Sequence, residues 1–384
     1  MSEISQICTR GVWDSTVPGI LFDEQGVSNY ACMFDKLSEA YPRGEKGKLQ
    51  WEKIVEKIKI EGKGKRYDCI VGVSGGTDSC YLLHLAKEYG LRPLAVNLDN
   101  GWSRDIAVNN IKKITNALNI DLETYVIDYE EVKSVLRAYL KASLPWVDSP
   151  TDLAIKASLY KIALREKVKY ILNGSDFRTE GKQPTEWTYS DAKQLKYLVR
   201  TVEHQKLKTY PYYTLSHLFY YGYIRQIKMY RPLYYLDYKK KEAQIFLKEK
   251  YGWEYYGGHH HENLFTKFII AYWLPQKFGI DKRKITLSAQ VLSGEISRNE
   301  ALELLKLPPY SKQDFEIDYQ FILKKLDFSE AEFDTIFKSP NKFYFNYPSY
   351  MPLLLKFKSL SKSVFRYVLP FIPSMYFELE SRKK

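Results

Sequence analysis

A pair of glycines between hydroxyl residues is the first feature of this sequence that can do chemistry. It lies in the run Ser74-Gly75-Gly76-Thr77-Asp78-Ser79, between an apolar stretch and a helical pattern. Adjacent glycines let backbone N–H groups approach an anion without obstruction by Cβ atoms. Ser74 and Ser79 add hydroxyl donors at a helix N-terminus, which carries a partial positive charge. The run predicts a phosphate-binding loop, with a plain capped turn between strand and helix as the alternative.

Asp78 distinguishes this loop from the Walker type, in which a lysine would stand at the end of the loop. A carboxylate beside a polyphosphate makes sense when Mg²⁺ lies between them, so Asp78 is predicted to contact this metal. We expect Asp78 to face solvent, so that its loss affects ATP turnover more than stability. The pattern S-G-G-x-D-S between a strand and a helix resembles the loop of PP-loop ATP pyrophosphatases, which implies catalytic roles for Ser74 and Asp78.

The elements that position this loop predict a doubly wound parallel α/β sheet of the PP-loop, adenine nucleotide alpha hydrolase-like type. Apolar runs at 69–73, 94–98, 124–127 and 170–172 alternate with helical patterns at 79–89, 106–118 and 153–166. In such a sheet the ligand lies beyond the carboxyl ends of the strands. We expect a small N-terminal lobe over 1–66, the nucleotide-binding domain over 67–250 and a mostly helical region over 251–384.

Polar residues at other strand ends are candidates for nucleotide contacts. Asn97 and Asp99 end the second predicted strand and can bond the ribose or the base of ATP. The alternative for these two residues is a helix cap with a turn glycine. Gly174 follows the fourth predicted strand and is expected to contact the same nucleotide.

The loop after the fourth strand is expected to contact the substrate. It contains Asn173, Asp176, Arg178 and Glu180. Asp176 is a candidate for the group that takes a proton from the attacking nitrogen, whereas Arg178 and Glu180 can also form a solvated pair.

Two further runs carry groups that can act on an anion or a sugar. One ammonium of Lys239, Lys240 and Lys241 can reach a phosphate, although three lysines in a row also suit a solvated helix start. His260 and His261 are predicted to recognise the substrate, and His260 can hold a proton during catalysis. A zinc site is the alternative, but adjacent histidines on a regular helix cannot all point at one metal.

Composition favours a polyanionic ligand in a reducing compartment. Lys and Arg number 58 against 46 Asp and Glu, which gives a formal net charge of +12. We expect a cytoplasmic protein, because the four cysteines are irregularly spaced and no apolar run is long enough to span a membrane. The stretch 343–377 mixes aromatics, prolines and lysines, and either packs as a tail or touches a membrane surface weakly.

With these residues assembled, the chain resembles the N-acetyl sugar amidotransferases of surface-polysaccharide and nonulosonic-acid biosynthesis. The resemblance rests on 22–27, 73–79, 95–102, 173–174, 178–180, 231–233, 256–268, 274–275, 278–283 and 292–298. It implies that ATP and Mg²⁺ activate the acetamido oxygen of an N-acetylated sugar, either nucleotide-linked or a free nonulosonate, in O-antigen lipopolysaccharide or nonulosonic-acid biosynthesis. Ammonia from a glutaminase and cyclase partner then gives an acetamidino group.

The N-terminal segment departs from that family, whose members carry two C-x-x-C pairs there. Cys8 remains, but Gly11 stands at the position of its mate, Ser28 and Ala31 stand at those of the second pair, and Cys32 is out of register. Two stray thiols cannot close a tetrahedral zinc site, so we predict no zinc and a lobe held by packing.

Two other classes of protein are alternatives to a sugar amidotransferase. A tRNA-modifying PP-loop enzyme would suit the positive charge and the many tyrosines, but the reactive cysteines of its thiolating versions are missing, and we expect no nucleic acid. A non-catalytic nucleotide-binding scaffold would not need the intact run 74–79. Copurifying RNA and ATP consumption, respectively, distinguish these alternatives from the amidotransferase.

Overall fold

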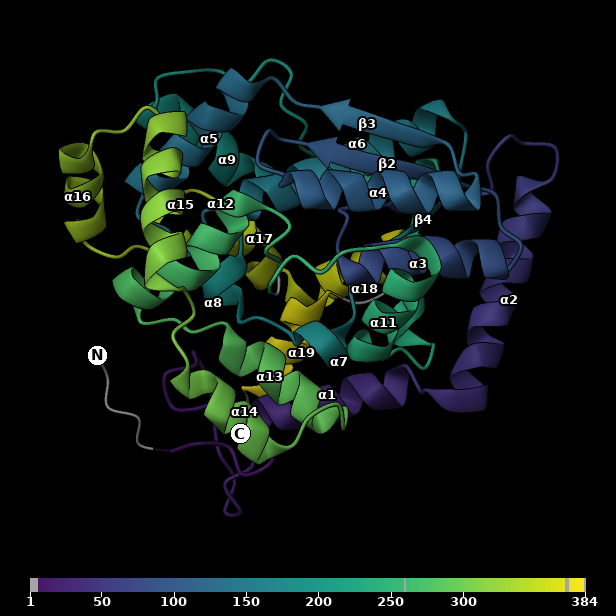
Figure 1. Ribbon diagram of the computed structural model, residues 1–384, viewed down its shortest axis with the longest axis horizontal. Coiled ribbons are helices and arrows are strands. Elements are labelled where there is room, and N and C mark those ends of the chain that lie inside the picture. The colour runs from purple at the N-terminus through teal and green to yellow at the C-terminus, as the bar shows by residue number, and fades with distance from the viewer. Residues whose placement is uncertain (1–5, 259, 370–372, 383–384) are drawn as a thin grey trace.

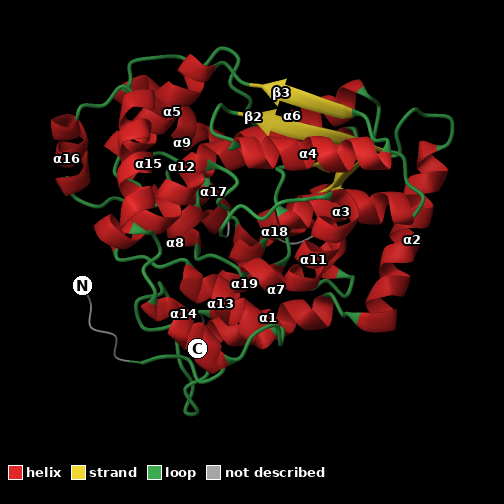
Figure 2. Cartoon of the chain, viewed as in Figure 1, coloured by secondary structure: helices red, strands yellow, loops and turns green. Residues whose placement is uncertain are grey.

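The computed structural model of the protein describes residues 6–258, 260–369 and 373–382, and it contains a parallel five-stranded sheet, of which β2 and β3 stand out in Figures 1 and 2. Its strand order is β3-β2-β1-β4-β5, and each neighbouring pair is parallel. The strands are β1 (Cys69–Gly72), β2 (Pro93–Asp99), β3 (Leu122–Val126), β4 (Tyr170–Leu172) and β5 (Lys228–Tyr230). The predicted α/β fold is therefore confirmed, with β5 as a strand that the sequence did not indicate.

The order of the strands determines where a ligand can enter. From β1 the chain passes outward to β2 and β3, then crosses to the other side of β1 to form β4 and β5. The carboxyl ends of β1 and β4 therefore lie side by side at the point where the strand order reverses, which is where ligands bind in open α/β sheets. The glycine run 74–76 follows β1, and Asn173 and Gly174 follow β4.

Both faces of the sheet are covered by helices, because alternate residues of each strand point to opposite faces. On one face, Cys69 and Val71 of β1 join a buried cluster with α2 (Gly44–Gly62), α3 (Thr77–Glu88), α4 (Asp105–Leu118) and α11 (Lys240–Tyr251). On the other face, Ile70 packs with Leu159 of α6 (Ser149–Arg165). Both layers hold β1 rigidly beneath the glycine run.

The remaining helices lie around the sheet, and many of them form a region to one side of it (Figure 1). They are α1 (Asn29–Ala40), α5 (Tyr129–Lys141), α7 (Phe177–Glu180), α8 (Thr185–Thr188), α9 (Ala192–Val202), α10 (Leu215–Phe219), α12 (Leu264–Phe268), α13 (Arg283–Leu292), α14 (Arg298–Lys306), α15 (Lys312–Lys325), α16 (Glu330–Lys338), α17 (Met351–Lys356), α18 (Lys358–Val368) and α19 (Ser374–Ser381), with π-helical turns over 220–224 and 269–278. The C-terminal region is mostly helical, as predicted. No helix within the described residues is long and apolar enough to cross a membrane.

The N-terminal residues pack against segments from the far end of the sequence. The Val12 amide donates to the Ser288 hydroxyl of α13 at 2.8 Å, and the Arg298 guanidinium donates to the carbonyls of Cys8 and Gly11. Trp13, Tyr30 and Phe268 belong to one hydrophobic cluster. The division at residues 66 and 250 stays a prediction, but the first and last thirds of the chain share this core.

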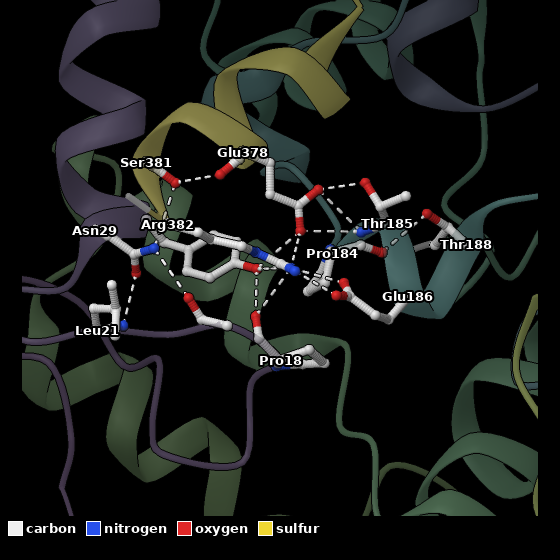
Figure 3. A network of polar contacts seen from close by, with 12 residues as sticks. Pro18, Leu21, Asn29, Pro184, Thr185, Glu186, Thr188, Glu378, Ser381 and Arg382 are labelled. Carbon is white, nitrogen blue, oxygen red and sulfur yellow. Dashed lines mark hydrogen bonds and ion pairs between the residues drawn. The ribbon is translucent and has the colours of Figure 1, made fainter. Parts of the chain in front are cut away.

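A polar network joins α1, α8 and α19 (Figure 3). Arg382 forms ion pairs with Glu378 and Glu186, and the Thr185 amide donates to the Glu378 carboxylate at 3.1 Å. The Tyr30 hydroxyl donates to the carbonyl of Pro18 at 2.8 Å. Because the side chain of Glu378 is only 5% exposed, this network fixes the end of the described chain against its beginning.

Candidate active site

The run 74–79 forms a tight loop at the N-terminus of α3. The Ser74 amide donates to Ser79 Oγ at 3.1 Å, and the Gly76 amide lies 3.3 Å from Ser74 Oγ. The Thr77 amide donates to the hydroxyl of Tyr256 at 3.3 Å. Hydroxyl groups therefore occupy positions around these amides where phosphate oxygens can bind, as expected for an anion site at a helix N-terminus.

Three glycines give this loop its shape. Gly75 has φ +82°, and a Cβ atom there would lie 2.3 Å from the carbonyl oxygen of Ala107. A Cβ atom at Gly174 would lie 3.0 Å from the backbone of Asp78, so the end of β4 abuts the start of α3. At Gly76 a Cβ atom would lie 3.1 to 3.2 Å from oxygens of Ser74, Tyr256 and Glu262. A side chain at Gly75 would clash with backbone, and one at Gly76 or Gly174 would crowd its neighbours, so glycines leave the loop amides open to a phosphate group.

Asp78 is held between one group from the segment before α11 and one from the first residue of α11. The Tyr238 hydroxyl donates to Asp78 Oδ1, and the Lys240 ammonium donates to Oδ2 at 3.0 Å. The expectation that Asp78 faces solvent is wrong, because its side chain is 14% exposed and that of Lys240 is 15% exposed. Burial alone would lower the pKa of Lys240, but Asp78, Tyr256 and Glu180 outweigh it and raise this pKa above its usual range.

Of the three consecutive lysines 239–241, Lys240 is thus the one that lies at the glycine loop. Lys239 pairs with Glu242 at 2.8 Å, and Lys241 pairs with Glu300 at 3.6 Å. Since Lys240 begins α11, packing of this helix against α3 fixes the ammonium beside Asp78. A buried cation at a glycine loop can neutralise the charge of a bound polyphosphate.

The loop after β4 places its polar residues at different depths. Asp176 is fully buried 3.8 Å from the Arg43 guanidinium, and burial raises its pKa to about 6. Arg178 is 4% exposed, and its guanidinium donates to the carbonyls of Tyr234 and Tyr41. The alternative of a solvated Arg178–Glu180 pair is therefore wrong, although a substrate contact by Arg178 stays a prediction.

Asn173, Asn97 and Asp99 differ in what they can offer a ligand. Asn173 Oδ1 accepts the Ser175 amide at 2.9 Å, and Asp99 Oδ1 accepts the Gly101 amide at 2.8 Å. Both side chains thus stabilise turns, the alternative considered for Asp99. Asn97 is 8% exposed within β2. The predicted nucleotide contacts of Asn97 and Asp99 stay predictions.

A glutamate from the segment before α12 lies against the glycine loop, and a histidine lies beside this glutamate. His260 Nδ1 lies 3.6 Å from Glu262 Oε1, and this carboxylate reaches the space beside Gly76. Burial lowers the pKa of His260, but Glu262 outweighs burial and raises it; His261 instead has its pKa lowered to about 4 by burial and Lys267. His260 therefore suits holding a proton, whereas His261 is neutral.

The carboxylate oxygens at the glycine loop fit a divalent cation that would also bind phosphate oxygens. Glu262 Oε2 is buried and accepts no hydrogen bond from the described residues, and Asp78 lies at the start of α3. No three His, Cys, Asp or Glu side chains of the described chain converge as ligands. Mg²⁺ usually takes only one or two carboxylates and fills its other positions with phosphate oxygens and water, so the donor set fits.

A second polar cluster lies beyond Glu180, whose carboxylate acts electrostatically on the Lys282 ammonium. Lys282 Nζ lies 3.5 Å from the ring centroid of Trp146, and Trp146 Nε1 donates to Asp152 Oδ2 at 3.1 Å. Burial raises the pKa of the adjacent Asp148 to about 6 and lowers that of Lys282 to about 8. The cluster places carboxylate acceptors and an ammonium donor around a buried aromatic ring.

Sequence analysis missed Tyr238, Tyr256 and Glu262 as parts of this site. Each comes from a segment more than 150 residues beyond the loop and reaches it only through the packing of α11 and the turn after it. The one signal was the position of Glu262, which directly follows the histidines that the sequence did single out.

The sheet order, the glycine loop after β1 and the adjoining strand end define a parallel α/β fold with a glycine loop at the carboxyl edge of its sheet. Residues 262–361 match the family model of the C-terminal domain of WbpG-like lipopolysaccharide (LPS) biosynthesis proteins. This stretch of the C-terminal region is therefore similar to that domain.

Individual relatives match less of the chain. An uncharacterized protein of Methanocaldococcus jannaschii is 39% identical over 92 residues, which span 24% of this chain and 32% of that protein. Among solved structures, an NH3-dependent NAD synthetase from Campylobacter jejuni shares 17% identity over 44% of this chain and 73% of its own, with a TM-score of 0.27. An NMN synthetase from Francisella tularensis shares 14% sequence identity over 61% of this chain and 94% of its own, with a TM-score of 0.29. A tRNA thiolase from Methanococcus maripaludis shares 13% sequence identity over 77% of this chain and 89% of its own, with a TM-score of 0.28.

Glu180→Gln is expected to stabilise the protein at pH 8 and to leave its stability at pH 4 unchanged. Burial, followed by the Asp78 carboxylate, raises the pKa of Glu180 from 4.5 to about 7. The folded state therefore binds this proton more tightly than the unfolded chain, so the stability it contributes is fully present below pH 4.5 and is lost as pH rises to 7. Thermal melts at the two pH values measure the difference, expected to be a few degrees in Tm.

The exposed Glu249, changed to Gln, is the control for this measurement. An equal shift in Tm at pH 4 and pH 8 for Glu180→Gln would show that the carboxyl group titrates normally.

Proposed function

We propose that this protein uses ATP to attach AMP to the acetamido oxygen of an N-acetylated sugar, and that ammonia then displaces AMP to leave an acetamidino group. One observation carries the proposal. The WbpG-like region begins at Glu262, and the carboxylate of this residue lies against Gly76 in the phosphate cradle. A domain of lipopolysaccharide biosynthesis proteins thus contributes directly to the loop of a PP-loop fold.

The chemistry requires activation, because the oxygen of an amide is a very poor leaving group. Attack of this oxygen on the α-phosphate of ATP forms a P–O bond and releases pyrophosphate. Ammonia adds to the carbon of the resulting imidate, and the C–O bond breaks as AMP leaves with the former acetamido oxygen. Mg²⁺ bound between Asp78 or Glu262 and the phosphates would screen their charge.

The residues of the chain have distinct parts in this sequence. The amides of the glycine loop and the Lys240 ammonium stabilise charge on the departing pyrophosphate, and Asp78 orients Lys240 through their 3.0 Å contact. His260, with its raised pKa, holds a proton near the reacting groups. Asp176 is the other proton acceptor that we considered, but its full burial beside Arg43 makes it the poorer choice.

The sugar is proposed to lie beside Lys282 and Asp152, the charged side chains that contact the buried Trp146 ring. Charged side chains bind the hydroxyl groups of sugars. Glu180 connects this cluster electrostatically to both Asp78 and Lys282. The acetamido group of a sugar in this place would then be directed toward the loop.

Ammonia is proposed to come from a partner that resembles the glutaminase and cyclase subunits of imidazole-glycerol-phosphate synthase. The described chain supplies the nucleotide loop and the polar cluster, and we assign none of its residues to glutamine hydrolysis. We therefore propose that the isolated chain forms the amidine when ammonium is supplied, and that it does not do so when glutamine is the only nitrogen source.

Heavy oxygen in the acetamido group of the substrate is expected to appear in the phosphate of AMP. The experiment incubates the protein with ATP, Mg²⁺, ammonium and an N-acetylated sugar labelled at the acetamido oxygen, and mass spectrometry measures AMP. One labelled oxygen per AMP is expected for each amidine formed. The same sugar labelled at a ring hydroxyl is the control, and its label should stay in the sugar.

Release of ADP and phosphate, or unlabelled AMP alongside the amidine, would rule out O-adenylylation. AMP release that depends on RNA instead of sugar would replace the proposal with tRNA modification.

A further inference from the structure

Two segments without acidic residues lie side by side on the surface of the protein. Residues 204–236 and 335–377 contain no Asp or Glu, whereas they contain five and six Lys or Arg residues, respectively. In the fold, α18 of the second segment contacts the π-helical turn 220–224 of the first. Segments far apart in the sequence thus combine into one surface that lacks negative charge of its own.

This surface exposes large apolar side chains, which we call the apolar patch. Its members are Phe219, Tyr220, Tyr223, Ile224, Leu353, Leu355, Phe357, Leu360 and Val364. Tyr223 is 57% exposed and Leu360 is 63% exposed. Contiguous exposed groups of this kind mark interaction sites on proteins that are otherwise covered by polar side chains.

The elements that present the apolar patch are anchored from beneath. Tyr221 stacks on Tyr160 of α6, with ring centroids 4.9 Å apart and planes at 3°. The Tyr376 hydroxyl of α19 donates to Ser361 Oγ of α18 at 2.6 Å. Because each element already buries an opposite face, the exposed side chains are not those that hold the fold together.

Cations accompany the apolar patch. Lys356 lies between Leu355 and Phe357, with its Nζ 5.7 Å from the Phe357 ring centroid, and Arg225 directly follows Ile224. Within the described residues, no ion pair joins either cation to a carboxylate. Lys362 forms an ion pair with Glu380 of α19 at 2.5 Å. A carboxylate therefore neutralises a cation only at the edge of this surface. Apolar side chains next to unpaired cations are typical of segments that lie in the interface of an anionic membrane.

We propose that the apolar patch, with Arg225 and Lys356, docks this protein on the surface of a membrane that contains anionic phospholipids. Aliphatic side chains such as Ile224, Leu355 and Leu360 insert among acyl chains but cannot stack on bases, which favours lipid over nucleic acid. A second copy is disfavoured because it would bring two basic surfaces together. This inference does not depend on the proposed sugar chemistry.

Flotation of the full-length protein with lipid vesicles tests the proposal. We expect binding to vesicles of phosphatidylglycerol and phosphatidylethanolamine, little binding to phosphatidylcholine alone, and loss of most binding in high salt. Tyr223→Ser combined with Leu360→Ser should reduce the bound fraction at least tenfold, and Arg225→Glu combined with Lys356→Glu should do the same. Ile245→Ser is the control, because Ile245 is 59% exposed on α11, outside the patch.

Thermal melts show whether each variant is folded, and every variant compared should melt like the unchanged protein. Equal vesicle binding by the patch variants and the Ile245 variant would overturn the proposal, as would failure of the unchanged protein to bind anionic vesicles. A concentration-dependent dimer that the patch variants abolish would show that a second copy covers this surface instead. RNA retention lost in the same variants would assign the patch to nucleic acid.

Discussion

Gly75→Ala is expected to lower ATP turnover by at least about 100-fold, the loss that follows removal of a single well-placed donor from a charge-stabilising site. Gly75 has φ +82°, and a Cβ atom there would lie 2.3 Å from the Ala107 carbonyl oxygen. An alanine can remain only if the loop or the start of α4 moves, which displaces the amides that bind phosphate. Steady-state AMP formation and calorimetric ATP binding measure the effect.

Gly64→Ala is the matched control for this substitution. Gly64 has φ +78°, but a Cβ atom there would have no other atom within 4 Å, so this position shares the backbone strain without the clash. An alanine in the left-handed region costs about 1–2 kcal/mol of stability at either site. Equal loss of turnover in both variants would show that strain, and not the shape of the loop, causes the defect.

Asp78→Asn and Lys240→Met are each expected to lower ATP turnover by about 100- to 1000-fold. Either change leaves one charge of a mostly buried pair without its partner, so the free energy of unfolding should also fall, by up to about 3 kcal/mol after allowance for residual exposure. The double variant removes both charges and should recover most of this stability. Its ATP turnover should remain low, because the cation is still missing from the loop.

Lys239→Met is the control, because Lys239 precedes Lys240 but pairs with Glu242 at the surface. Urea unfolding measures stability, and AMP formation measures turnover. A double variant that regains activity together with stability would mean that the pair only holds α11 against α3.

The strands near the loop could be predicted because their sequence alternates with clear helical patterns. The three residues of β4 were predicted with their observed bounds, and the glycine loop follows β1 as expected. β5 could not be predicted in this way, because its three residues lie in a tyrosine-rich segment without an apolar run. They form a strand only because β4 offers an unpaired edge.

The site itself was predictable only in its local part. The sequence indicated the glycine loop, and it indicated that one of three consecutive lysines can reach a phosphate. It could not show that Tyr238 and Lys240 both donate hydrogen bonds to the Asp78 carboxylate. It also suggested that Asp78 faces solvent, because the helix that covers this carboxylate begins 162 residues later. Burial and pairing depend on how α11 packs, and local propensity contains no information about that.

The contacts of the N-terminal lobe have a consequence for the order of folding. A ribosome releases residues 8–40 early, but their partners Ser288, Arg298 and Glu378 are synthesised hundreds of residues later. This segment is made before its partners and is thus among the last that can complete their native contacts, and such widely separated pairs slow folding. Its buried tyrosine and tryptophan side chains remain exposed throughout synthesis, when chaperones can bind them.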